Sequence, residues 1–266
     1  MQNEMKTCKQ KETMQNEKKA CGQKETMQNE IKACGQKKTM QNDMKAYAEK
    51  MLSAFEICQP DAKIREKVQR NWDAVAKPLD GMGMFEKITA QIGSIQGTER
   101  AAVEKRAVIV FCADNGIVAE GISQSGQEVT AAVAHSMGKQ ASSVGIMGKQ
   151  TGTDVIPVDI GICGTEQIPG VLSRKVMPGT GNFAKEPAMM PVQTMQGIQT
   201  GIELAGLCKK RGYQLLATGE MGIGNTTTSS AVAAALLGCT AAEVTGRGAG
   251  LSDAGLLHKQ QVITDA

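Results

Sequence analysis

The chain has 266 residues, of which 41% are hydrophobic and only 3% aromatic, and its formal net charge is +3. This length and apolar content predict one large domain, or one domain with a smaller appendage, around a real hydrophobic core. No stretch has the roughly 18–20 apolar residues that a membrane span needs, and the polar N-terminus does not fit a secretory signal, so we expect a cytoplasmic protein without a membrane partner. The lysines crowded into the first 50 residues lack aromatic or arginine interleaving, so we expect no nucleic-acid partner.

Cysteine and histidine usage argues against a metal centre. Eight cysteines are present, but Cys8, Cys21 and Cys34 belong to a repeat and the other five are scattered, with no Cys-x-x-Cys pair. The only histidines are His135 and His258. This pattern predicts reduced thiols, no bound metal and no cofactor.

The first 39 residues are a tandem repeat. Met1, Met14, Met27 and Met40 begin near-identical copies with a period of 13 residues. On an α-helix, at about 100° per residue, thirteen steps rotate each copy by roughly 220° from the last, so the copies cannot share one buried face. We expect residues 1–39 to form a disordered or loosely helical tail that arose by duplication of a start region. A partner-binding arm is the alternative.

Residues 40–100 read as a helical N-terminal subdomain. Apolar residues at helical spacing predict two helices before residue 76, the second with Asp61 as its N-cap after Pro60. A turn at "KPLDGMG" precedes a third helix, over about residues 84–95.

Residues 101–266 predict an α/β core. The apolar run 107–113 ends in Asp-Asn-Gly, as a buried parallel strand does, and further strands are expected at 153–162 and 212–220. Helices are expected over about 128–150, 192–210 and 254–266, with an alanine-rich helix after residue 224. This alternation predicts a mainly parallel sheet flanked by helices, a Rossmann-like three-layer fold.

Polar and glycine-rich tips follow the predicted strands, at 114–116, 159–161 and 219–222. Such sheets bind ligands at the carboxyl ends of their strands. The segments "PGTGNF", "GEMGIGNTTT" and "TGRGAGLSD" would let backbone amides approach an oxyanion, and the last two also open helices, which together predict a phosphate cradle. Each segment alone could be an ordinary turn, because none is a Walker loop or a G-x-G-x-x-G site.

Glu220 is the unexpected member of this group. A carboxylate beside a phosphate site repels the ligand unless it serves a cationic ring or a proton transfer. The alternative is a structural role, with Glu220 capping the backbone amides of the turn.

Over about residues 45–266 the chain resembles the nicotinate-nucleotide–dimethylbenzimidazole phosphoribosyltransferase family. The resemblance is carried by "KPLDGMGMFE", "FCADNGIVAEGISQSGQEVTA", "VIPVDIGI", "PGTGNFAKEPAM", "GEMGIGNTT" and "GRGAGL", in the family's order. It implies transfer of phosphoribosyl from nicotinate mononucleotide to 5,6-dimethylbenzimidazole, which gives α-ribazole 5′-phosphate and nicotinate with inversion at the anomeric carbon. It also implies a homodimer.

The resemblance assigns roles to particular residues. Glu220 and Lys259 match an acid and a lysine near the reacting groups, as supporting catalytic residues, and Ser125 should lie at the benzimidazole pocket. The full set of implied substrate-binding residues is Asp114, Ser125, Gly222, Gly224, Asn225, Thr226, Thr227, Gly246 and Gly248.

Two departures from the family pattern matter. Asn115 stands where the family usually has a histidine. Family members also continue into a further segment with a Gly-Glu-Gly motif whose glutamate is the general base, so we expect an incomplete chain that is essentially inactive. A non-catalytic nucleotide- or phosphate-binding module is the alternative function, and nucleic-acid binding through residues 1–45 is a third.

Overall fold

The computed structural model describes Ser53 and residues 57–266, and residues 58–266 form one compact unit. The predicted tail at 1–39 and nearly all of the first predicted helix lie outside the described residues. Within the described part of the chain, no helix combines the length and apolar character needed to cross a bilayer.

Within residues 57–266, helices α2 (Ala62–Asp73) and α3 (Met84–Gln96) precede the sheet and pack against each other. Asp61 caps α2, because its carboxylate accepts hydrogen bonds from the N–H groups of Lys63 at 2.8 Å and Ile64 at 3.1 Å. The predicted N-cap is confirmed, and the predicted helix at 84–95 matches α3 to within one residue.

The sheet has four parallel strands in the order β3-β2-β1-β4. They are β1 (Arg106–Ala113), β2 (Thr153–Gly161), β3 (Leu172–Ser173) and β4 (Leu215–Met221). The other elements are the 3₁₀ turn η1 (Gly116–Glu120) and helices α4 (Glu128–Gly138), α5 (Ser143–Thr151), α6 (Pro191–Lys210), α7 (Asn225–Leu237), α8 (Ala241–Val244) and α9 (Asp253–Asp265). The predicted parallel α/β fold is confirmed, and the short elements η1, β3 and α8 were not predicted.

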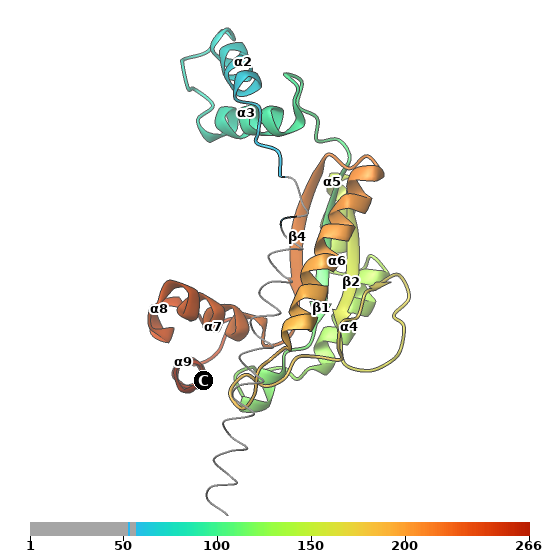
Figure 1. The fold of residues 1–266 in the computed structure, drawn as a ribbon, viewed down its shortest axis with the longest axis vertical. Coiled ribbons are helices and arrows are strands. Elements are labelled where there is room, and N and C mark those ends of the chain that lie inside the picture. The colour runs from blue at the N-terminus through green and yellow to red at the C-terminus, as the bar shows by residue number, and fades with distance from the viewer. Residues whose placement is uncertain (1–52, 54–56) are drawn as a thin grey trace, which may run out of the picture. The chain divides into compact units, whose positions relative to one another are not determined.

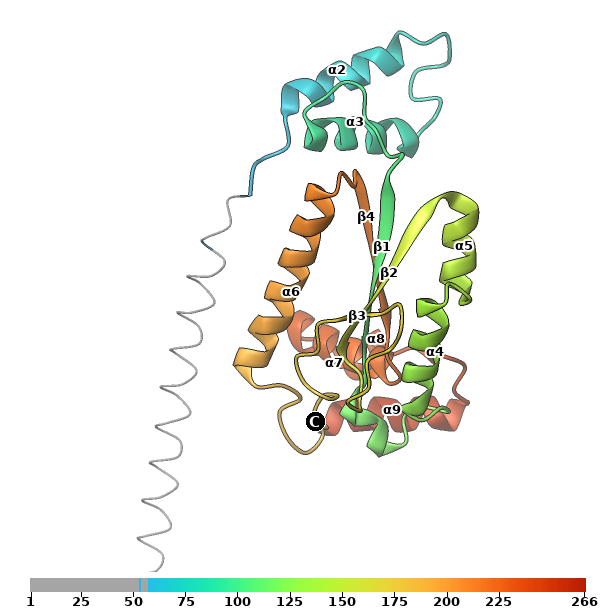
Figure 2. The same cartoon turned by 90° about the vertical axis from the view of Figure 1, so that its right-hand side faces the viewer.

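Alternate residues of the central strand β1 face two separate cores. Val110 and Cys112 pack with Ala134 of α4, whereas Ile109 packs with Leu204 of α6. Figure 2 shows α6 on one side of the sheet, with α4 and α5 on the other. Burial on both faces explains the continuous apolar run that predicted this strand.

The single helix predicted over 128–150 is wrong, because the chain breaks between α4 and α5. Gln140 adopts a left-handed conformation with φ of 56°, and the Ser142 hydroxyl then accepts a hydrogen bond from the Gly145 N–H at 3.2 Å to cap α5. At the end of α4, an ideal Cβ on Gly138 would lie 2.2 Å from the Pro169 carbonyl oxygen. This close approach of two backbone segments fixes where α4 ends.

The expectation that the strand before Glu220 is buried is also wrong. Leu215, Ala217, Thr218 and Glu220 of β4 are all exposed. Within the described residues β4 lies at the edge of the sheet and pairs only with β1. Figure 1 shows α7, α8 and α9 gathered near the carboxyl end of β4 rather than along its length, so they do not shield the strand.

Candidate anion site at the start of α7

The polar tips after β1, β2 and β4 meet at one edge of the sheet, as predicted. The Asp114 N–H donates to the Gly161 carbonyl at 3.0 Å, which joins the ends of β1 and β2. The Asn115 side chain donates to the Ile223 carbonyl at 3.1 Å, which joins β1 to the loop after β4. The loop that leads into α7 is therefore anchored at the carboxyl ends of the strands.

A cavity of about 150 Å³ opens beside that loop. Its walls come from the segment before α4, the loop and first turn of α7, the loop before α9, and α9 itself. They are formed by residues 122–124, 221–227, 247–249, 251 and 259. Cavities that hold whole drug-sized ligands are typically about 300–1,000 Å³, so this one has the size for a single small group such as a phosphate.

Two glycines shape the entrance to α7. An ideal Cβ on Gly222 would lie 2.2 Å from the Ala113 carbonyl oxygen, so no larger residue fits there without a shift of backbone. Gly224, at the N-cap, has a φ of 88°, which favours glycine, and it supplies no side-chain cap. The N–H groups of Asn225 and Thr227 already donate to the Gly222 and Gly224 carbonyls at 3.0 Å. Those of Gly224 and Thr226 have no acceptor outside the helix within residues 57–266, so they and the helix dipole are available to an anion.

Lys259 provides a buried positive charge in the cavity. Only 1% of the residue is exposed, and its Nζ donates to Thr226 Oγ1 at 2.7 Å and to the Gly246 carbonyl at 3.3 Å. Among the described residues no carboxylate forms an ion pair with it, and desolvation lowers the pKa of its ammonium group. A buried lysine without an acidic partner is costly unless an anion completes the site.

Thr227 adds a second incomplete group. The residue is fully buried, it lines the cavity, and its Oγ1 has no hydrogen-bond partner among the described residues. Buried hydroxyls are normally hydrogen-bonded, so an unsatisfied one at a cavity wall indicates a missing ligand atom or water. Together with Lys259 it favours an oxyanion.

Glu220 lies next to this cavity but does not line it. Its carboxylate accepts a hydrogen bond from the side chain of Asn225 and lies close to Gly222. Although the residue as a whole is exposed, desolvation of its carboxyl raises the pKa, and the Asn225 bond acts in the opposite direction. The contact is with a side chain, and no bond from Glu220 to the turn amides occurs among the described residues, which disfavours the capping role.

Most of the expected binding residues meet here. Gly222, Gly224, Asn225, Thr226, Thr227 and Gly248 line the cavity together with Lys259. Gly246 contributes only its carbonyl, which accepts from Lys259.

Two expected residues lie elsewhere. Ser125 is exposed and does not line the cavity, whereas its neighbours Ser123 and Gln124 do. Asp114 is buried and does not line the cavity. One of its carboxylate oxygens accepts from the Cys163 N–H at 2.7 Å, and the other has no partner among the described residues.

Arg247 was not predicted, although it lines the cavity. Its guanidinium donates to the Leu251 carbonyl at 2.9 Å and forms an ion pair with Asp253. The glycines on either side of Arg247 in "TGRGAG" are the sequence signal that could have identified it. Gln124, also not predicted, donates to the Gly250 carbonyl at 3.0 Å and so holds the same loop.

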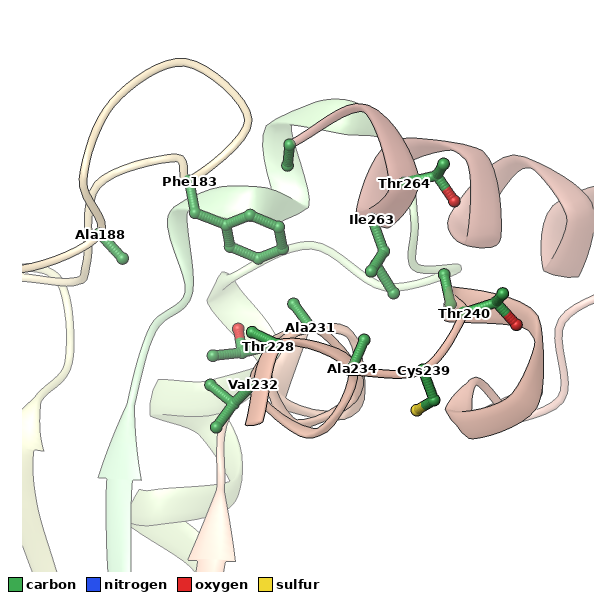
Figure 3. A pocket seen from close by; sticks show the side chains of 13 residues that line it. Phe183, Ala188, Thr228, Ala231, Val232, Ala234, Cys239, Thr240, Ile263 and Thr264 are labelled. Carbon is green, nitrogen blue, oxygen red and sulfur yellow. The ribbon is translucent and has the colours of Figure 1, made fainter. Parts of the chain in front are cut away.

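A larger cavity of about 620 Å³ lies between α7, α8, the end of α9 and the loop at 183–188 (Figure 3). In Figure 3 the Phe183 ring and Ile263 face α7 across it. Its lining includes no charged side chain, so it lacks the groups that would hold a phosphate. The smaller cavity is therefore the candidate anion site.

Comparison with known proteins places the chain in a family. Residues 57–266 match a family model described as "Phosphoribosyltransferase". Two relatives named nicotinate-nucleotide–dimethylbenzimidazole phosphoribosyltransferase are similar: one from Ruminiclostridium cellulolyticum is 40% identical and one from Acetivibrio thermocellus 42%, each over 76% of this chain and 57% of the relative. A crystal structure of CobT from Thermus thermophilus superposes with a TM-score of 0.73 at 35% identity, over 77% of this chain and 62% of that one. The chain thus spans a little over half the length of these curated relatives.

Proposed function

Because the chain belongs to the nicotinate-nucleotide–dimethylbenzimidazole phosphoribosyltransferase family, we propose that it binds nicotinate mononucleotide and takes part in phosphoribosyl transfer to 5,6-dimethylbenzimidazole. The nucleotide phosphate occupies the cavity at the start of α7. The observation that carries this proposal is the buried Lys259, which lines the cavity without an acidic partner among the described residues.

The groups around the cavity suit a phosphate in particular. Lys259 supplies a point charge, the start of α7 supplies amides, and the Thr227 hydroxyl supplies a further hydrogen-bonding group. A phosphate has several oxygens and can accept from all three at once.

Two side chains of opposite charge form hydrogen bonds with adjacent residues in the first turn of α7. Lys259 donates to Thr226, and Glu220 accepts from Asn225. We propose that Lys259 balances the phosphate while Glu220 faces the cationic pyridinium and ribose. The bond between the anomeric carbon and the ring nitrogen breaks, its electron pair returns to the ring, and the pyridinium charge disappears.

The azole nitrogen then forms the new bond to the anomeric carbon from the opposite face, with inversion. The azole proton must leave to a base. Glu220 is the carboxylate that this chain places beside the cradle, and desolvation raises its pKa, which makes it a stronger proton acceptor than an ordinary glutamate.

Binding is tested by calorimetry with the full 266-residue chain. Nicotinate mononucleotide should bind, nicotinate riboside (which lacks the phosphate) should bind at least about tenfold more weakly, and Lys259→Met should lose about 10- to 100-fold in affinity for the nucleotide, as expected for a charge-assisted hydrogen bond. Lys149→Met, at an exposed position on α5, is the matched control and should leave affinity unchanged. Equal affinity for nucleotide and riboside would contradict the phosphate site.

Chromatographic detection of α-ribazole 5′-phosphate in the same samples tests Glu220 as the base. Turnover that Glu220→Gln abolishes supports this role, and binding without turnover contradicts it. In the second case, turnover restored by appending a family segment with the Gly-Glu-Gly motif supports an incomplete enzyme, and continued inactivity favours the nucleotide-binding module.

We further propose that the chain works in the cytoplasm as a homodimer. The described cysteines, including the exposed Cys58 and Cys163, are free thiols, as in reduced compartments. The mass of the protein in solution, measured by light scattering, tests the dimer.

A further inference from the structure

We infer that Asn115 is a positioning residue that holds the phosphate-binding loop in its working shape. This inference rests on the proposed function of the cavity. Asn115 does not line the cavity and touches no substrate group, so it acts only through the loop.

The side-chain amide of Asn115 joins both sides of the turn at Gly224. Its Nδ2 donates to the Ile223 carbonyl at 3.1 Å, and its Oδ1 accepts from Thr228 Oγ1 at 2.9 Å. Only 8% of Asn115 is exposed, and its own carbonyl accepts from Gln127 Nε2 at 3.0 Å, which fixes its backbone. One buried side chain thus ties the end of β1 to the residue before the turn and to the first turn of α7.

The bond to Ile223 also sets the direction of the next amide. In a trans peptide the C=O and the following N–H point in opposite directions. With the Ile223 carbonyl held toward Asn115, the Gly224 N–H is directed away from it, and this N–H has no acceptor within residues 57–266. Gly224 lines the cavity, so we assign its N–H as a phosphate donor that Asn115 orients.

This role requires a compact group that donates and accepts at the same time. An asparagine amide does both, and a neutral imidazole also offers one donor and one acceptor. An aspartate carboxylate accepts only, and a leucine of similar size does neither. These differences allow the role to be tested with Asn115→His, Asn115→Asp and Asn115→Leu.

The probe is sulfate, which keeps a constant charge across the pH range used and mimics the phosphate. Calorimetry measures its affinity for the 266-residue chain and each variant from about pH 4 to about pH 8. At neutral pH, Asn115→Leu and Asn115→Asp should bind sulfate about tenfold or more weakly. The aspartate loses the bond to the Ile223 carbonyl, and the leucine loses both that bond and the one from Thr228. Asn115→His should stay within about threefold of the unsubstituted chain.

The aspartate variant adds a pH profile to this comparison. When pH falls through the pKa of the introduced carboxyl, the neutral acid can donate to Ile223 again and no longer repels sulfate. Its sulfate affinity relative to the unsubstituted chain should therefore recover at low pH, whereas the ratio for Asn115→Leu should stay low throughout. Because relief of repulsion alone would also give this recovery, the uncharged Asn115→Leu variant decides the orienting role: a residue that serves stability alone would change its melting temperature and leave its sulfate affinity unchanged.

The outcomes separate the two proposals. If the unsubstituted chain does not bind sulfate, the phosphate cradle of the proposed function fails and this inference fails with it. If the unsubstituted chain binds sulfate and the folded Asn115→Leu or Asn115→Asp variant binds equally well at neutral pH, only the role of Asn115 is contradicted. Should Asn115→Leu not fold, Asn115→Ala, which is smaller and also uncharged, takes its place in this comparison.

Discussion

Lys259 couples anion binding to pH. Burial lowers the pKa of its ammonium group, and without ligand the unfolded chain binds that proton more tightly than the folded one. The free energy of unfolding should therefore rise with pH through the window between the lowered pKa and the ordinary lysine value of about 10.4. Anion affinity should change with pH in the opposite direction, because only the protonated lysine pairs with the ligand.

We accordingly expect sulfate affinity to fall as pH rises through the lowered pKa of Lys259, below the range where an ordinary lysine titrates. Sulfate binding in that window should take up protons, measured as a dependence of the calorimetric enthalpy on the ionisation enthalpy of the buffer. Lys259→Arg should bind sulfate with no such proton uptake, because arginine stays charged, while Lys149→Arg should behave like the unsubstituted chain. A flat affinity profile for the unsubstituted chain up to about pH 10 would contradict this coupling.

Single residues of the site differ in how far the sequence could identify them. The glycines and hydroxyl residues of "GEMGIGNTT" imply a phosphate loop by themselves, and the structure places them together. Lys259 could be identified only through the family resemblance, because nothing in "GLLHKQQ" marks that lysine as buried. Ser125 stays a predicted residue of the benzimidazole pocket, whereas Ser123 and Gln124 of the same irregular loop line the phosphate cavity. In the sequence, Asn115 is only a departure from the family's usual histidine. Its two side-chain hydrogen bonds are visible only in the structure.

Two glycines within helices differ in whether the surrounding atoms leave space for a side chain. At Gly138 an added methyl group would meet the Pro169 carbonyl, which belongs to backbone and cannot simply turn aside. At Gly206, inside α6, nothing lies within 4 Å of an ideal Cβ. The first glycine is required by packing, and the second only weakens its helix.

The two alanine substitutions should therefore have opposite signs. Gly138→Ala should lower the free energy of unfolding by about 1–3 kcal/mol, as overpacking does. Gly206→Ala should raise it by about 0.5–1 kcal/mol, because alanine loses less backbone entropy in a helix. Urea unfolding followed by circular dichroism measures both, and destabilisation by Gly206→Ala would show that α6 has a partner surface there.

Element boundaries were predicted well where local signals act and poorly where distant contacts decide. Asp61 and the apolar spacing after it suffice to start α2. The break after α4 depends on the loop at 168–171, about thirty residues further along, so periodicity within 128–150 could not reveal it. The burial of β4 was misjudged for a similar reason: an apolar strand sequence does not say whether a neighbour lies on each side.

The strands of the sheet differ in their pairing and in their burial. β1 is paired on both sides, with β2 and β4, and its residues reach both cores. β4 pairs with β1 alone within the described residues, and much of its surface is exposed. The sequence predicted the parallel class of the sheet but not this asymmetry, which depends on strand order.

Because one side of β4 is unpaired within the described residues, we expect its backbone amides to differ in hydrogen–deuterium exchange. Backbone N–H groups of successive strand residues point to alternate sides, so in β4 every second amide is directed away from β1 and should exchange within seconds to minutes. Its bonded amides should exchange by fraying of that strand, and those of β1 only by global unfolding. In 57–266 we therefore expect protection to fall from β1 to β4, measured residue by residue by NMR. Equal protection of alternate β4 amides would mean that another strand covers this edge in solution.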